Sequence, residues 1–480
     1  MREIKNLMNR IALTIVLGGC LAIAGNAATF IVNSSADDQN DGCGIAANGC
    51  TLREAVGAAN AANDADTITI DAGITTITLL TGEIAVNTGA VTITPSVVNA
   101  PVTIDGAANG RIFNVFANTT LNRLLLTNAA SSADGGAIIN NGAVLTVNDS
   151  YLTNNTANGN GGGIYTNGGT VNFNRSTIGG TVTPAPATGN GAANGGGIYN
   201  LNGTVVLSNS TISGNRSGNI GGGYYGFASL GAASLSSTIS TVAFNTATNG
   251  GGIAVSSTLG FTSSASINNT IVSNNTAMTS NDLNGNPLIT GLPGTITSGG
   301  YNIIRNTTGA TVVAITGDQF NVDPLILPLG ANGGLTPTHG LRLSPVSPAI
   351  DKGNTALTVD QRGLTRPVDL PPVNAVNGSD IGAFEAQFGT TAAEVIVGGR
   401  VIGISGRGIS GATVRITGTN GATQRTRTNP FGFYRFLKVP SGATYVISAS
   451  LRNRTTNPRV ISVIQDTTDV DLQEEPRVPN

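Results

Sequence analysis

A short glycine-rich element recurs through the middle of the chain, and this repeat limits the fold more than any other feature of the sequence. Each copy ends in one apolar or aromatic residue and follows the previous copy by about 26 to 34 residues. The copies are GGAI at residues 135–138, GGGI at 161–164, GGGI at 195–198, GGGY at 221–224 and GGGI at 250–253. Self-similarity at such a period is typical of solenoid proteins, in which each repeat packs on its neighbours.

Runs of alternating apolar and polar residues lie between these elements, such as VLTVNDSYL at residues 144–152. Alternation indicates short β-strands, and a unit of this size buries its apolar face only when similar units stack on it. Glycine and asparagine suit the corners because both tolerate positive φ, and asparagines at equivalent corners are expected to form hydrogen-bonded ladders. We therefore predict an all-β fold with a right-handed parallel β-helix over residues 68–320. At about 25 residues per coil and about 4.8 Å between coils, it has about ten coils and a length of about 50 Å.

Residues 28–67 are predicted to cover the first coil, because an exposed solenoid end would pair with other strands. The run from Leu52 to Asn63 is rich in Ala and contains Leu, Arg and Glu, which favour a helix. A short capping helix is therefore expected there.

The first 27 residues have the organisation of a cleaved signal peptide. Arg2, Lys5 and Arg10 precede an apolar run over residues 11–24, and small residues follow it up to Ala27. The run is too short to span the roughly 30 Å hydrocarbon core of a bilayer, and we predict no transmembrane segment in the mature chain. The protein is therefore expected to be extracellular or at a bacterial cell surface or outer membrane. Alternatively, the LGGC sequence ending at Cys20 resembles a lipobox, which would make Cys20 a lipidated N-terminus.

Removal of the leader leaves two cysteines, Cys43 and Cys50, which we predict form a disulfide in an oxidising compartment. Metal binding by the two thiols is the alternative, although a single histidine excludes a multi-histidine site. The loop from Asp37 to Asp41 offers oxygen ligands for Ca²⁺ but lacks a closing glutamate, so a solvated turn is favoured. We predict no cofactor and no metal.

Charge separates a second domain from the solenoid region. Residues 28–393 carry 10 Lys or Arg and 19 Asp or Glu, whereas residues 394–480 carry 11 and 6. A linker is predicted at residues 387–393, a small β domain at 394–474 and a tail at 475–480. Only 10% of all residues are charged, with a net charge of -2, which excludes a typical nucleic-acid binder. The arginines of the second domain form either a solvated strand face or a contact for anionic envelope polymers; they include Arg425, Arg427, Arg435, Arg452 and Arg454.

Two N-terminal patterns resemble those of bacterial surface proteins. The run Cys50-Thr51-Leu52-Arg53-Glu54-Ala55 resembles the motif of the domain named for Cys-Ser-Leu-Arg-Glu-Ala, with Thr in place of Ser. The repeats resemble those of polymorphic outer-membrane proteins, in which an Asn-rich stretch precedes the Gly-Gly-Ala-Ile element. Asn155-Thr156-Ala157 before Gly161 shows that order here. Neither resemblance implies a chemical activity.

Two C-terminal regions also resemble known domains. Residues 281–386 resemble the choice-of-anchor Q domain, which implies an extracellular β-helix; its last part is residues 321–386, and the matching segments are 281–283, 300–304, 323–325, 332–334, 336–339, 347–351, 360–363, 366–367 and 380–385. Residues 394–474 resemble a carboxypeptidase-regulatory-like domain, through segments 398–401, 411–416, 428–436 and 439–442. That resemblance implies a transthyretin- or immunoglobulin-like β-sandwich with an accessory role. Strands every 8 to 12 residues with glycine turns favour the same sandwich.

Catalysis has little support in the sequence. Between Leu124 and Asn281 the charged residues are Asp134, Asp149, Arg175 and Arg216. Glycoside hydrolysis needs two neighbouring carboxylates, but Asp134 and Asp149 stand less than one coil apart and are not expected to stack. We predict no catalytic residue.

Three further polar residues have a structural and a functional interpretation. His339 is favoured as a structural hydrogen-bonding group over a catalytic one. Asp360 and Arg362 are favoured as a local ion pair or turn over a functional pair.

The sequence thus predicts an exported, non-enzymatic β-helical protein for adhesion or structural display, a monomeric rod that contacts an extracellular surface or glycan. A polysaccharide-binding or polysaccharide-degrading β-helix, similar to a lyase or glycosidase, is the alternative.

Overall fold

The computed structural model describes residues 27–38, 42–43, 49–182, 187–285, 292–343, 345–370, 377–387, 394–418, 423–441, 443–452, 454–463 and 466–475. The predicted leader up to residue 26, including Cys20, lies outside the described residues, as do residues 388–393 of the predicted linker. In the described part of the chain, no helix is both long and apolar enough to cross a membrane.

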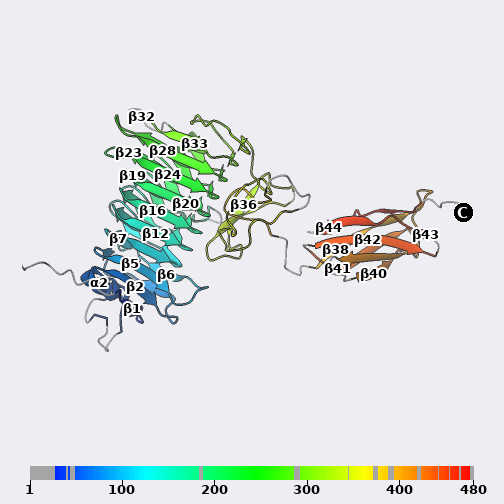
Figure 1. The fold of residues 1–480 in the computed structure, drawn as a ribbon, viewed down its shortest axis with the longest axis horizontal. Coiled ribbons are helices and arrows are strands. Elements are labelled where there is room, and N and C mark those ends of the chain that lie inside the picture. The colour runs from blue at the N-terminus through cyan, green and yellow to red at the C-terminus, as the bar shows by residue number, and fades with distance from the viewer. Residues whose placement is uncertain are drawn as a thin grey trace, which may run out of the picture.

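The chain forms a β-solenoid of about 8 turns, whose strands stack into four sheets along the rod (Figure 1). Sheet A contains β1 (Thr29–Val32), β2 (Ala65–Ile70), β5 (Ala90–Pro95), β8 (Thr119–Asn122), β12 (Val144–Asn148), β16 (Thr170–Asn174), β20 (Thr204–Ser208), β24 (Ala233–Thr238), β28 (Ser263–Asn268) and β33 (Thr295–Ser298). Sheet B contains β3 (Thr76–Thr78), β6 (Val102–Asp105), β9 (Leu124–Thr127), β13 (Tyr151–Thr153), β17 (Thr177–Gly179), β21 (Thr211–Ser213), β25 (Thr241–Ala243), β29 (Ile271–Ser273), β34 (Ile303–Ile304) and β35 (Gln319–Phe320).

The other two sheets complete each coil. Sheet C contains β4 (Ile84–Val86), β7 (Phe113–Val115), β11 (Ile138–Asn141), β15 (Ile164–Asn167), β19 (Ile198–Leu201), β23 (Tyr224–Ala228), β27 (Ile253–Ser257) and β31 (Leu283–Asn284), and β32 (Leu292–Pro293) pairs antiparallel with β27. Sheet D contains β10 (Ala130–Ser131), β14 (Thr156–Ala157), β18 (Gly191–Ala192), β22 (Arg216–Ser217), β26 (Thr246–Asn249) and β30 (Thr276–Thr279). A coil runs through sheets C, A, B and D in that order, and among the described residues the strand pairings between coils are parallel except that of β32.

Register between coils follows the sequence repeat. The isoleucines that close the glycine-rich elements align directly, Ile138 with Ile164 and Ile164 with Ile198. On sheet A, Val147 aligns with Phe173 and Phe173 with Leu207, and all three are buried in the continuous core of the rod. Along the corner that follows sheet B, equivalent residues of successive coils are 25 to 35 positions apart. This spacing is longer than the expected 25, so the rod has about 8 turns rather than ten.

The glycine-rich elements allow coils to approach backbone to backbone. A Cβ atom at Gly162 would lie 2.4 Å from the carbonyl oxygen of Gly196 and 2.6 Å from the backbone nitrogen of Gly191. Real Cβ atoms do not approach so closely, so any side chain here would push neighbouring coils apart.

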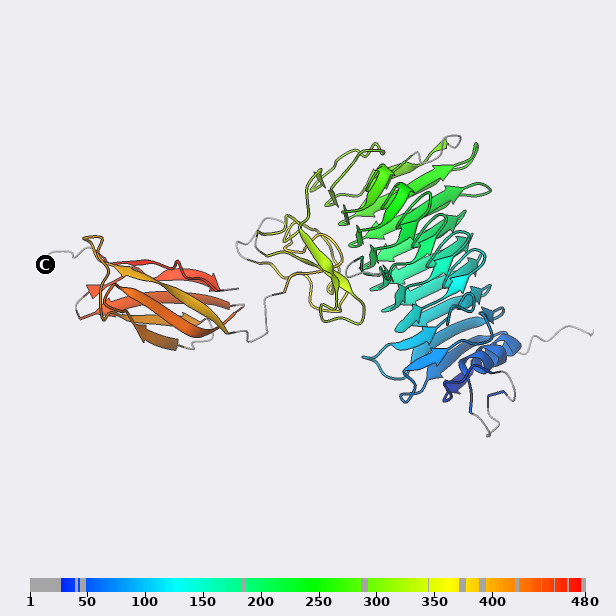
Figure 2. The same ribbon diagram turned by 180° about the vertical axis from the view of Figure 1, so that it is seen from behind.

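A helix covers the N-terminal end of the rod, as predicted (Figure 2). Helix α2 (Leu52–Ala62) begins with a capping box, because the hydroxyl of Thr51 accepts from the Glu54 N–H and the Glu54 carboxylate accepts from the Thr51 N–H. Its Leu52 and Val56 side chains pack into the core of the first coil. The predicted disulfide Cys43–Cys50 is present directly before the helix.

A row of buried asparagines runs through the rod at the corner that follows sheet B. The Oδ1 atom of Asn215 accepts hydrogen bonds from the backbone N–H and the Nδ2 of Asn190, at 3.2 and 2.9 Å. Its Nδ2 donates to Oδ1 of Asn245 and to the carbonyl of Ile178, each at 2.9 Å. The same four bonds recur at Asn190, Asn245 and Asn275. The row begins at Asn155, whose Oδ1 accepts from the Ala129 N–H, and ends at Asp282. The expected asparagine ladder is thus confirmed.

The chain then returns along the outside of the rod and packs on sheet B. We call residues 321–387 the flank subdomain; its described residues form an antiparallel pair, β36 (Ile326–Gly330) and β37 (Thr338–Leu341), and otherwise loops (Figure 1). Its apolar residues, including Ile350 and Ile381, share a second core with Ile271 and Ile303 on the outer face of sheet B.

The C-terminal region is a sandwich-like pair of sheets. One sheet contains β38 (Glu394–Ile402), β41 (Phe433–Pro440) and β45 (Leu472–Gln473). The other contains β39 (Thr413–Gly418), β40 (Thr423–Arg427), β42 (Ala443–Leu451), β43 (Arg454–Thr455) and β44 (Arg459–Val463). Val397, Val414, Phe436, Ile447 and Leu472 lie in the core between them.

The buried row yields a first prediction. Replacing Asn215→Ala leaves the backbone N–H of Asn190 without its partner and removes one hydrogen bond each from the Asn190 side-chain amide and the Ile178 carbonyl, which is expected to lower the free energy of unfolding by about 3 kcal/mol. Urea unfolding of the full chain, followed by circular dichroism, measures the loss.

Asn148→Ala is the matched control, because Asn148 is half-buried and water replaces its side-chain bonds. We expect a loss of about 0.5 kcal/mol there. Equal losses in the two variants would contradict the role given to the buried row.

Candidate binding groove

Corners between sheets A and B hold a row of residues in the left-handed region. Arg123, Asp149, Arg175 and Asn209 have φ values of 52°, 50°, 47° and 48°. Asparagine adopts this conformation readily, but for most L-residues it costs roughly 1 kcal/mol or more. The prediction of glycine and asparagine at corners is therefore only partly correct, because charged side chains occupy three successive corners.

A second row of amides lies beside these charges. Asn148 donates from Nδ2 to Oδ1 of Asn122 at 2.9 Å, and Asn174 donates from Nδ2 to Oδ1 of Asn148 at 2.8 Å. All three side chains are half-buried, unlike the buried asparagine row. Each amide nitrogen carries two hydrogens, so the row also offers donors toward solvent.

The two rows form one wall of a groove of about 550 Å³, which we call the corner groove. Its lining residues are Asn122, Arg123, Asn148, Asp149, Asn174, Arg175, Ser208, Asn209, Leu357 and Val359. Leu357 and Val359 come from the flank subdomain and form the opposite wall. A hollow of about 190 Å³ under residues 331–337 shares Asp149 with the corner groove.

The three charges of the corner groove are held differently. Arg175 binds both carboxylate oxygens of Asp149, with Nε–Oδ1 and Nη2–Oδ2 distances of 2.8 and 2.6 Å. Arg123 instead donates from Nη2 to Oγ1 of Thr94 and to the carbonyl of Pro95, each at 2.8 Å. Among the described residues, no carboxylate forms an ion pair with Arg123, and its Nε is buried without a hydrogen-bond partner.

Hydroxyl groups on the outer face of sheet B hold the flank subdomain in place. Gln361 accepts from Oγ1 of Thr211 at 2.6 Å and donates from Nε2 to Oγ1 of Thr177 at 2.8 Å. The corner residue Asn209 donates from Nδ2 to the carbonyl of Val359 at 2.8 Å and accepts from Nη1 of Arg366 at 3.2 Å. These contacts fix the distance between the two walls of the corner groove.

His339 belongs to the same contact surface. Its Nε2 lies 2.8 Å from Oγ of Ser213, and its Nδ1 lies 2.7 Å from the carbonyl oxygen of Leu327. Because Nδ1 donates to that carbonyl, Nε2 accepts from the serine hydroxyl. Burial lowers the pKa of His339 to about 4, so the ring is neutral at pH 7. These bonds join β37 to β21 across the flank, and the pair opens on a cavity of only about 60 Å³.

The other polar residues singled out in the flank region are held in buried ion pairs. Asp360 binds Arg362 at 2.7 Å, which is the local pair favoured from the sequence. Arg366 binds Glu385 at 2.7 Å, and both side chains are fully buried. Burial, reinforced by the charge of Glu385, raises the pKa of Asp380 well above its usual value.

At the N-terminal end, Asp37 lies in a buried ion pair rather than in a solvated turn. Arg53 donates from Nε to Oδ1 of Asp37 at 2.7 Å, and the backbone N–H groups of Leu80 and Thr81 bind its Oδ2. Burial opposes ionisation, but these hydrogen bonds hold the pKa of Asp37 below its usual value. Residues 39–41 of the predicted loop lie outside the described residues.

Neither the two aspartates of the rod, Asp134 and Asp149, nor its aromatic residues form another open site. Asp134 accepts from the N–H and Nδ2 of Asn160, away from the corner that holds Asp149. The rings of Tyr165 and Tyr199 stack at 5.4 Å, and Tyr199 meets Tyr225 edge-on. All three tyrosines are buried in one apolar cluster, so their rings are not a platform for sugars.

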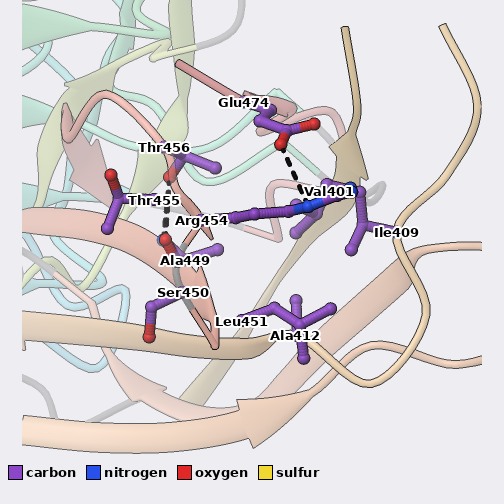
Figure 3. A pocket seen from close by; sticks show the side chains of 10 residues that line it. All are labelled: Val401, Ile409, Ala412, Ala449, Ser450, Leu451, Arg454, Thr455, Thr456 and Glu474. Carbon is purple, nitrogen blue, oxygen red and sulfur yellow. Dashed lines mark hydrogen bonds and ion pairs between the residues drawn. The ribbon is translucent and has the colours of Figure 1, made fainter. Parts of the chain in front are cut away.

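The sandwich contains a small notch at one end (Figure 3). Arg454 reaches across it toward Glu474, with 3.4 Å between Nε and Oε1, and Thr456 bonds to the backbone of Ala449. Its volume of about 10 Å³ is enough for one water molecule. The exposed arginines of this region, among them Arg425, Arg427 and Arg435, lie on strand faces.

A prediction about the pH dependence of stability follows from a buried carboxyl group of the flank subdomain. Burial raises the pKa of Asp351 to about 6, so the folded protein holds this proton more tightly than the unfolded chain. Its contribution to stability is therefore complete below about pH 4 and is lost as the pH rises through 6. Asp351→Asn keeps the acceptor for the Leu370 N–H and suits the positive φ of 54°.

We expect Asp351→Asn to raise the unfolding temperature of the full chain by about 3 °C at pH 8 and to leave it unchanged at pH 4. Differential scanning calorimetry between these pH values measures the difference. Asp71→Asn, which removes an exposed carboxylate of the rod, controls for the loss of one negative charge. Equal stabilisation in both variants would contradict the account.

Comparison with known proteins assigns a family to the C-terminal region and gives none for the rod. A search of curated proteins found no match to this chain. The family model of the carboxypeptidase regulatory-like domain matches residues 396–473, which covers the strands from β38 to β45. The sandwich at the C-terminal side of the chain is therefore a carboxypeptidase regulatory-like domain.

Proposed function

We propose that this protein is an exported, non-enzymatic scaffold of the cell surface or the extracellular space, in which the β-helical rod serves adhesion or structural display. The disulfide Cys43–Cys50 supports the first part of the proposal, that the protein is exported. Disulfides persist in oxidising compartments and are rare where cellular thiols are kept reduced. It lies directly before the capping helix, where it joins two residues of the segment that precedes α2.

The construction of the rod supports the second part of the proposal, that the protein is a scaffold. Its core is continuous from the capped end to the last coils, and its inner corner carries amide groups that bond only to neighbouring coils. Such a structure gains length by adding coils and presents long lateral faces. The carboxypeptidase regulatory-like domain at residues 396–473 fits an accessory module on such a protein.

A second candidate function is glycan binding, which the corner groove favours. Among the described residues that line it, Asp149 is the only carboxylate, and Arg175 binds both of its oxygens. Glycoside hydrolysis uses one carboxyl group as an acid and a second as a base or nucleophile. The groove therefore suits binding of a sugar chain better than its cleavage.

Export is tested with the full chain expressed in a bacterial host. We expect N-terminal sequencing to find cleavage after Ala27, protease added to intact cells to degrade the protein, and Cys43 and Cys50 to resist alkylation until reduced. Cys20→Ser is expected to leave all three results unchanged, because it removes only the lipidation alternative. Protein that stays in the cytoplasm with two alkylated cysteines would contradict export.

Absence of catalysis is tested on a panel of plant, algal and bacterial polysaccharides. The purified protein is expected to release neither reducing ends nor unsaturated ends from any of them, because the corner groove holds one ion-paired carboxylate. Release from a single polysaccharide, if abolished by Asp149→Asn, would overturn the non-enzymatic proposal.

A further inference from the structure

An uncompensated positive charge lies in the corner groove. The groove holds Arg123, Asp149 and Arg175, and the last two neutralise each other in a bidentate pair. Arg123 is half-buried, its hydrogen bonds to the described residues are made from Nη2 alone, and they go to uncharged oxygens. A half-buried guanidinium without a carboxylate attracts an anionic group more strongly than a fully solvated one.

The wall beside that charge repeats at the spacing of the coils. Asn122, Asn148 and Asn174 lie on paired strands, so their amides follow one another at about 4.8 Å. That interval is close to the length of one sugar ring along an extended glycan. Amide groups donate to and accept from hydroxyls, so successive rings of a glycan would meet equivalent hydrogen-bonding groups.

The opposite wall is built by a different part of the chain. Leu357 is 37% exposed and Val359 is half-buried, and both are held over the corner row by the bonds of Asn209 to Val359 and Arg366. Apolar side chains across from a polar row match the two kinds of surface on a sugar ring, its C–H face and its hydroxyl edge.

The three charged corners belong to a row of left-handed residues that continues along the rod through Asn209, Ile239 and Asn269. Arg123, Asp149 and Arg175 occupy the left-handed region, where asparagine or glycine would be less costly. The next corner, Asn209, also lines the groove and bonds there to the flank subdomain. Because the buried Ile239 adopts the same backbone conformation, that conformation belongs to the corner geometry, and the charged side chains are what distinguish the three groove corners.

We propose that the corner groove binds an acidic oligosaccharide, with Arg123 receiving the carboxylate of a uronic acid and the row Asn122, Asn148 and Asn174 binding hydroxyls of the neighbouring rings. The proposal adds a ligand to the scaffold and does not depend on export, because it is measured on purified protein. A cytoplasmic location would overturn the scaffold function and leave this binding unaffected.

Isothermal titration calorimetry of the purified full chain at low salt tests the proposal, with hexagalacturonate as the acidic probe and cellohexaose as the neutral one. We expect hexagalacturonate to bind at least tenfold more tightly than cellohexaose, and Arg123→Gln to weaken its binding about tenfold. Arg216→Gln removes an exposed arginine of sheet D outside the groove and is expected to change nothing.

A pair of substitutions on the opposite wall separates binding from folding. Leu357→Glu is expected to weaken hexagalacturonate binding at least threefold, and Leu357→Lys to strengthen it by a similar factor, because the two place opposite charges in the groove. A change that acted only through stability would move both variants in the same direction. Thermal unfolding of each variant confirms that the chain is folded.

Several results would overturn the proposal. These are no heat of binding with hexagalacturonate, equal affinity for the two hexamers, wild-type affinity in Arg123→Gln, or changes of the same sign in the two Leu357 variants. Loss of binding in Arg216→Gln would also overturn it, because the charge would then act from another face.

Discussion

In-register hydrogen bonding between coils is the constraint on which the rest of this structure depends. The buried asparagines add side-chain bonds to that pairing, so each coil must return to the same corner whatever its length. Asn155 and Asn190 are 35 positions apart, whereas Asn190 and Asn215 are 25 apart. The longer coil has its extra residues between β17 and β18, outside the strands. Variation in length is thus confined to corners, where it does not disturb the core.

Much of the rod could be predicted from its sequence, because its repeats report directly on local geometry. Interactions within one coil or between two neighbouring coils explain the glycine-rich elements, the alternating runs and the helix at residues 52–62. Cys43 and Cys50 were also predicted to pair. The number of coils was overestimated, since an insertion at a corner lengthens a coil without breaking the repeat.

The corner groove could not be predicted in the same way, because its two walls are far apart in the sequence. Asn209 and Val359 are 150 positions apart, and the repeat does not indicate that the chain folds back. One local feature of the sequence does indicate the polar side of the groove. An asparagine followed by a charged residue occurs at Asn122, Asn148 and Asn174, each 26 positions after the last. A polar pair that recurs at the coil period marks one stripe on the surface of the rod.

Return of the chain along the flank changes how the rod would carry mechanical load. The flank subdomain bonds to Thr177, Thr211 and Thr241, which lie on three successive coils, before the chain reaches the carboxypeptidase regulatory-like domain. A force applied to that domain therefore acts on the side of the rod and is distributed over these coils. Strands loaded together in shear resist far more force than coils peeled one at a time from an end. Force applied to the C-terminal domain is thus expected to reach the rod through the flank subdomain and not through the last coil alone.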